Sequence, residues 1–136
     1  MTVFVCIDDR GGMLFGNKRQ SRDSILLSDM ADTVGEGLLY ISDFSESLIA
    51  RSDMSAVCVP YPLDTAGEGD FVFNECFHIK NHTGRINRLV IYKWNRRYPY
   101  DFALDIDPVA EGFSLKESYD FVGSSHDKIT KEIYEK

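Results

Sequence analysis

The chain has 136 residues, with 15 Lys and Arg against 22 Asp and Glu, so its net charge is −7. This length suits one domain that buries roughly two-thirds of its unfolded surface, and the acidic balance argues against a protein that coats DNA or adheres to an anionic membrane. No apolar run approaches the roughly 20 residues of a membrane span, and Asp8 ends the first run too early for a signal peptide. We therefore expect a cytoplasmic protein, with Cys6, Cys58 and Cys76 as reduced, buried thiols.

Strands alternate with helices in the first half of the chain. Thr2–Ile7 is a continuous apolar run, which is typical of a buried central strand. A glycine-containing loop and an irregular stretch at 13–20 follow, and a helix is expected to begin near Ser21, carry Asp23 in its first turn and stop at Gly35. The next expected elements, in chain order, are a strand at 38–41, a helix at 42–50, a strand at 56–59, a loop at 64–70 and a strand at 71–73.

The second half of the chain is richer in strands. We expect a polar turn at 79–84, a strand at 89–94, an extended segment at 101–107 and a short strand at 113–115. Ile129 and Ile133 have helical spacing, but we predict a strand at 128–134 because tertiary context overrides such a local preference. The predicted fold is a single compact α/β domain over residues 1–136, with a central mixed sheet and flanking helices.

Several segments have counterparts in one known family. The run Val3-Phe4-Val5-Cys6-Ile7-Asp8-Asp9-Arg10-Gly11-Gly12, the run Arg22-Asp23-Ser24-Ile25-Leu26, and the later Asp-Phe-x-Leu-Asp-Ile and Gly-Phe-Ser-Leu stretches resemble dihydrofolate reductase in a shortened form. The resemblance implies that Asp23 stands where the family keeps a carboxylate for the pterin ring. It also implies that Thr2–Ile7 is central in the sheet, flanked by 38–41 and by 71–73 or 89–94.

Two cofactor motifs of that family are altered. Its phosphate-binding turn is Gly-Arg-x-Thr-x-Glu-Ser, where this chain has Ser42-Asp43-Phe44-Ser45-Glu46-Ser47, and its Gly-Gly strand end corresponds to Asn74-Glu75. Bulky and acidic side chains obstruct the close approach of a pyrophosphate to the backbone. We therefore expect no bound cofactor, no NADPH binding and no reductase activity. The alternative is an enzyme, either a divergent reductase or a nuclease acting on RNA.

Three short stretches, at 9–15, 92–96 and 123–130, resemble a group of short bacterial proteins that carry the label ribonuclease Z. Enzymes of that name hold two zinc ions with a cluster such as His-x-His-x-Asp-His, and none of the three histidines here has that spacing. Cys76, His78 and His82 are residue types that can bind zinc, and they lie in or just before the polar turn at 79–84. The run Ser124-Ser125-His126-Asp127 holds the residue types of a hydrolytic triad, but neighbours in sequence rarely point at one another. We predict no metal site and no catalytic residues.

Ten of the 15 cations lie in two stretches without acids, 10–22 and 76–100. We predict that these stretches converge on one concave face and bind a small, nucleotide-like anion, with phosphate on the cations and the base on an aromatic side chain. The negative total charge makes RNA a less expected partner, and separate solvated surfaces are the open alternative. The sequence does not specify the oligomeric state. The predicted ligand-binding residues are Arg10, Lys18, Arg19, Arg22, Asp23, Tyr92, Trp94 and Arg96.

Overall fold

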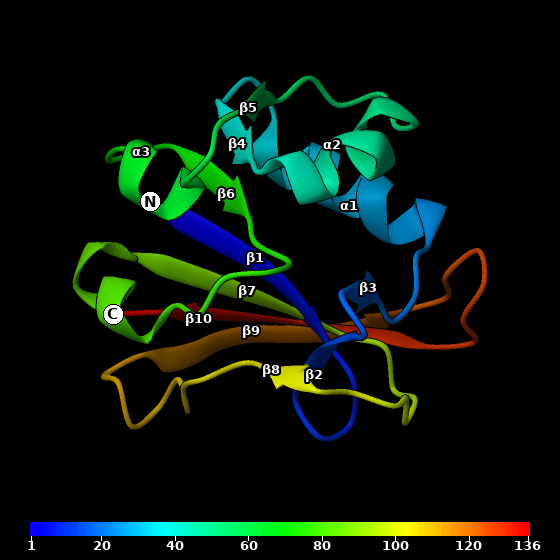
Figure 1. Cartoon of the computed structure of the whole chain (residues 1–136). Coiled ribbons are helices and arrows are strands. Elements are labelled where there is room, and N and C mark those ends of the chain that lie inside the picture. The colour runs from blue at the N-terminus through cyan, green and yellow to red at the C-terminus, as the bar shows by residue number, and fades with distance from the viewer.

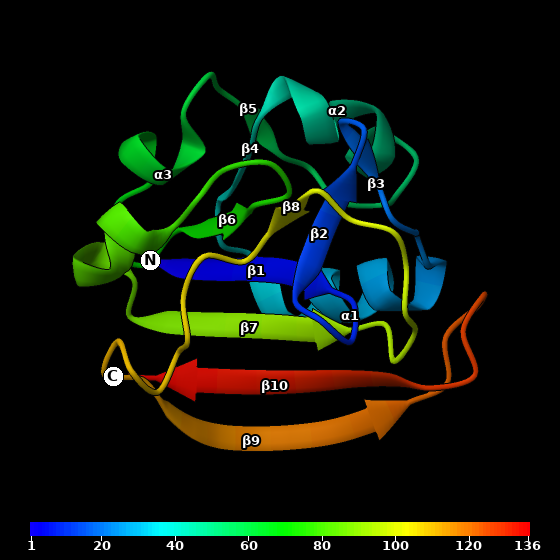
Figure 2. The same cartoon turned by 60° about the horizontal axis from the view of Figure 1, so that its bottom comes forward.

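A computed structural model describes all of residues 1–136. Its main feature is a seven-stranded sheet in the order β5-β4-β6-β1-β7-β10-β9 (Figures 1 and 2). The strands are β1 (Thr2–Ile7), β4 (Leu39–Ile41), β5 (Val57–Cys58), β6 (Phe71–Phe73), β7 (Arg88–Lys93), β9 (Ser114–Phe121) and β10 (Ile129–Glu135). No helix of the structure combines the length and the apolar character that a membrane crossing demands.

The first strand lies in the middle of this sheet, as predicted. β1 runs parallel to β6 on one side and to β7 on the other. The expected contact between β1 and the strand at 38–41 is wrong, because β4 pairs with β6, which lies between them. The C-terminal strand is confirmed: β10 runs antiparallel to both β7 and β9, so the sheet is mixed.

The alternation of side chains along β1 divides the core into two layers. Val3, Val5 and Ile7 point into one layer, and Phe4 points into the other. The Phe4 layer is covered by α1 (Ser24–Val34) and α2 (Asp43–Ala50). The opposite layer is covered by the short helix α3 (Pro62–Thr65), the 3₁₀ turn η1 (Lys80–Arg85) and a small second sheet. The predicted α/β architecture with helices flanking a central sheet is therefore confirmed.

The second sheet occupies the stretch that was expected to be a loop. Its order is β3 (Lys18–Arg19), β2 (Gly12–Phe15) and β8 (Phe102–Ala103), and it crosses in front of the main strands in Figure 2. Gly16 and Asn17 both have positive φ, near 60°, which is the geometry of a two-residue hairpin turn. The stretch at 13–20 has no clear hydrophobic period, so its two short strands were not expected, whereas the pair Gly16-Asn17 is the sequence signal of a hairpin turn.

Candidate functional site: a cavity at the ends of the parallel strands

A small cavity lies at the carboxyl ends of β1, β6 and β7. Phe73 at the end of β6 and Trp94 just after β7 line it, together with side chains of α1 and α2. Both helices lie above the main sheet in Figure 1. Ligands of open α/β sheets bind at this edge, outside the carboxyl ends of the strands. The apolar part of the lining consists of Met13, Leu26, Leu27, Leu48, Phe73 and Trp94.

Asp23 lies at the edge of this cavity, but its carboxylate is used by the chain itself. It is the N-cap of α1, so the helix begins one residue after Asp23 and not near Ser21. Oδ1 accepts hydrogen bonds from the backbone N–H groups of Ile25, Leu26 and Ser124, at 3.0, 3.2 and 2.9 Å. Oδ2 accepts one from the N–H of Ser125, at 2.8 Å. The carboxylate thus ties the start of α1 to the loop before β10.

Burial alone would raise the pKa of Asp23, because it penalises the charged form. Hydrogen bonds from the N–H groups of Ser125 and Ser124 and from the His126 side chain outweigh burial and hold the pKa well below its usual range. Gly123 permits this close packing, since a Cβ at that position would collide with the Asp23 carboxylate. Asp23 is therefore ionised at neutral pH.

His126 completes a buried polar network that the sequence analysis did not place at the site. Its Nδ1 lies 3.1 Å from Oδ2 of Asp23, and both side chains are almost fully buried. Its Nε2 lies 3.1 Å from Oγ of Ser21 and 3.0 Å from the Tyr98 hydroxyl. The ring stacks on Trp94 with centroids 4.6 Å apart. Ser21 and His126 are 105 residues apart in sequence, so no local pattern could indicate their contact.

A bidentate ion pair crosses the cavity from the β2–β3 hairpin to the end of β6. Nε and Nη2 of Arg19 each donate to a Glu75 oxygen at 2.8 Å, and Ser45 donates to the same carboxylate at 2.7 Å. The hydrogen bond to Glu75 raises the pKa of Arg19. Burial and the nearby Glu75 charge raise the pKa of the Cys6 thiol, which lines the same cavity as a neutral group. The charge of Arg19 is thus neutralised inside the protein.

Two other arginines lie at a wider opening beside the cavity. This opening shares Arg22, Asp23, Leu27 and Leu48 with the cavity and adds Arg51 at the end of α2. The guanidinium groups of Arg22 and Arg51 take part in none of the ion pairs of the chain. Sequence analysis missed Arg51 because it lies outside both basic stretches.

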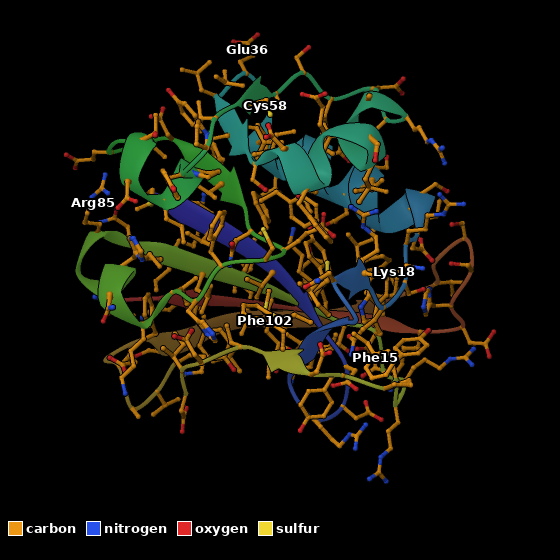
Figure 3. The ribbon with its side chains drawn as sticks, viewed as in Figure 1. Phe15, Lys18, Glu36, Cys58, Arg85 and Phe102 are labelled. Atoms are coloured by element: carbon orange, nitrogen blue, oxygen red, sulfur yellow. The ribbon has the colours of Figure 1, made fainter.

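The remaining predicted site residues lie away from the cavity. Arg10 donates to the Tyr98 carbonyl and covers the Tyr100 ring, so the two basic stretches do meet at this loop. Tyr92 is fully buried beneath α1 and donates to Asp29 at 2.6 Å. Lys18 and Arg96 are exposed. Figure 3 shows Lys18 and Arg85, one from each stretch, on opposite sides of the molecule.

The other candidate ligands for a metal do not gather at the cavity. Cys76 lies beside Ser42, whereas His78 and His82 lie beside different aspartates. A separate group of Asp43, Glu46 and Cys58 lies at the surface, where hydrogen bonding to Asp43 raises the pKa of Cys58 to about 12. All three cysteines are free, but Cys58 is exposed, which corrects the expectation that every thiol is buried (Figure 3).

The fold belongs to a known class. No protein-family model and no curated protein sequence matches the chain. Comparison with solved structures shows that the chain has a dihydrofolate reductase-like fold, as the sequence resemblance implied. A particular match is the dihydrofolate reductase from Enterococcus faecalis complexed with NADP(H) and RAB-propyl, with a TM-score of 0.71 and 11% sequence identity. The match covers 98% of this chain and 94% of that chain, so the likeness extends over the whole domain.

Proposed function

We propose that the chain is a binding module of dihydrofolate reductase-like fold that holds a small, flat, nucleotide-like anion. The observation that carries this proposal is the pair Arg22 and Arg51, two guanidinium groups without ion-pair partners at the opening of an apolar cavity. Guanidinium groups recognise phosphate and carboxylate through paired hydrogen bonds. The anionic group of the ligand therefore lies at the opening, and its ring lies inside.

The interior suits an aromatic ring of modest size. Hydrophobic side chains make up more than half of its lining, as in many small-molecule sites. The lining also offers the Ser21 hydroxyl and the Gln20 amide as polar groups that orient a ring. A mononucleotide, with its phosphate at the opening and its base inside, is a better candidate than RNA, because the net charge of −7 repels a long polyanion.

The module does not act as an NADPH-dependent reductase in this proposal. The Glu75 carboxylate follows β6, where the resembled family has glycine, and it is held there by Arg19 and Ser45. Asp43 and Glu46 occupy the first turn of α2, where their charges repel a phosphate. The proposal includes a reducing, cytoplasmic setting, which the three free cysteines support.

Fluorescence of Trp94 tests the proposal directly, because Trp94 is the single tryptophan of the chain and lines the cavity. Titration with AMP and GMP at low salt is expected to change its emission and saturate. Arg22→Ala and Arg51→Ala are each expected to weaken binding about tenfold, the loss of one charged hydrogen bond. Arg97→Ala, at an exposed position away from the cavity, is the matched control.

Two results would contradict the proposal. One is an emission that no nucleotide changes at low salt. The other is equal affinity in the wild type and in the Arg22→Ala, Arg51→Ala double variant. A separate assay with NADPH and dihydrofolate is expected to show no loss of NADPH absorbance, and steady turnover there would favour the divergent reductase instead.

A further inference from the structure

We propose that Ser21, His126 and Asp23 form a nucleophile, a base and an orienting carboxylate that hydrolyse a short-chain carboxylic ester in the cavity. The three side chains form one continuous chain of hydrogen bonds, from Asp23 Oδ2 to His126 Nδ1 at 3.1 Å and from His126 Nε2 to Ser21 Oγ at 3.1 Å. This is the order of contacts by which an imidazole activates a hydroxyl. The inference uses the same cavity and shares Arg22 with the proposed binding function, but it does not depend on phosphate binding and makes no use of Arg51.

The tautomer of the neutral His126 ring follows from its neighbours. An ionised Asp23 can only accept hydrogen bonds, so Nδ1 of His126 must donate to it. In the neutral ring, Nε2 is then the acceptor, and it lies within hydrogen-bond reach of the Ser21 and Tyr98 hydroxyls. Trp94 covers one face of the ring and restricts its rotation. In this tautomer, the acceptor nitrogen of His126 faces the hydroxyls of both Ser21 and Tyr98.

The surroundings of Ser21 favour an acyl substrate. Ser21 is only partly buried and lines the cavity, whereas Asp23 and His126 are buried behind it. Leu26, Leu48 and Phe73 of the same lining suit a short acyl chain. Arg22, the next residue, lines the same cavity and takes part in no ion pair, and in the proposal its guanidinium group faces the oxygen that becomes negative.

The reaction follows from these positions. Ser21 Oγ attacks the carbonyl carbon while its proton moves to Nε2 of His126, and the carbonyl oxygen becomes negative. The bond from carbon to the alcohol oxygen then breaks, and His126 gives its proton to that oxygen. Water attacks the acyl-serine, loses a proton to Nε2, and the carboxylic acid leaves as Ser21 recovers its proton. The products are one acid and one alcohol for each water consumed.

Covalent labelling with an alkyl fluorophosphonate tests the assignment. The Ser21 oxygen is expected to displace fluoride from phosphorus, and mass spectrometry of the digested protein is expected to find the adduct on Ser21. Ser21→Ala is expected to remove the label, while Ser47→Ala, an exposed serine on α2, keeps it. Because this probe is uncharged, failure of labelling would leave the anion-binding proposal standing.

Turnover of p-nitrophenyl butyrate gives the second measurement. Ser21→Ala is expected to lower kcat/KM by at least about 100-fold. Asp23→Asn, checked by circular dichroism to be folded, is expected to lower kcat with KM unchanged, since Asp23 acts through His126. No adduct on the wild type, an adduct on Ser125 in place of Ser21, or equal turnover in Ser21→Ala would overturn the proposal.

Discussion

At the scale of single residues, Asp23 carries an unusual number of contacts. Four backbone N–H groups, the Ser125 hydroxyl and the His126 ring converge on its two oxygens. The chain itself thus occupies this carboxylate, for which the family resemblance implies a contact with a ligand ring. Asp23 instead fixes the geometry of the groups around the cavity.

Asp23→Ala is expected to lower the free energy of unfolding by roughly 3 kcal/mol or more. The change removes a helix N-cap, worth about 1 kcal/mol, and leaves buried donors without an acceptor, at about 1–3 kcal/mol each. Urea unfolding followed by circular dichroism measures this loss. Asp32→Ala, an exposed aspartate on α1, is the control; a loss no larger than that of the control would contradict the role assigned to Asp23.

The depressed pKa of Asp23 also predicts how stability depends on pH. In the unfolded chain the carboxyl binds its proton near pH 4, whereas in the folded protein it does so only at lower pH. Stability from this group is therefore complete above about pH 4 and is lost as the pH falls toward the folded pKa. Unfolding free energies measured across the acid range should fall more steeply for the wild type than for Asp23→Ala, and parallel curves would count against this prediction.

At the scale of elements, a buried lysine connects α1 to the sheet. Nζ of Lys131 on β10 lies 2.8 Å from Asp29 of α1 and donates to Thr33 at 2.8 Å. The same Asp29 oxygen accepts from Tyr92 on β7. Burial and hydrogen bonding to Asp29 raise the pKa of Tyr92, so its hydroxyl remains a donor. One helix and two strands are thus joined through one carboxylate.

Lys131→Met is expected to destabilise the protein by about 2–3 kcal/mol, because Asp29 then keeps a charge without its partner. Asp29 is partly exposed, which limits the loss. Tyr92→Phe removes one hydrogen bond and is expected to cost about 1 kcal/mol. A double-mutant cycle in thermal or urea unfolding measures the coupling of Lys131 with Asp29, and additive losses would show that the pair contributes nothing.

One ion pair joins the β2–β3 hairpin to the end of a strand of the main sheet. Arg19 of β3 reaches Glu75 after β6, and no other ion pair joins the hairpin to the rest of the chain. Glu75→Gln is expected to speed hydrogen exchange at 12–19 several-fold, since the bidentate ionic contact is lost. Glu68→Gln, at an exposed loop position, should leave that exchange unchanged; equal rates in the two variants would contradict this prediction.

At the scale of the whole molecule, the sequence predicted the sheet better than the site. Long apolar runs such as Thr2–Ile7 and Phe71–Phe73 define buried strands by composition alone, and the family resemblance supplied their order. The hairpin at 12–19 was not predicted, because its two strands are short and are joined by a tight turn. The contacts of Ser21 with His126 and of Arg19 with Glu75 could not be predicted, because the partners lie more than 50 residues apart in the sequence.

The central place of β1 has a consequence for synthesis on the ribosome. Thr2 and Arg88, on adjacent strands, are 86 residues apart, and β6 on the other side is also far along the chain. At about 5–20 residues per second, β1 leaves the ribosome several seconds before either neighbour exists. During that interval the apolar run of β1 has no partner strand. The nascent chain therefore exposes an unpaired hydrophobic segment, the kind of surface that chaperones bind, until β7 has been translated.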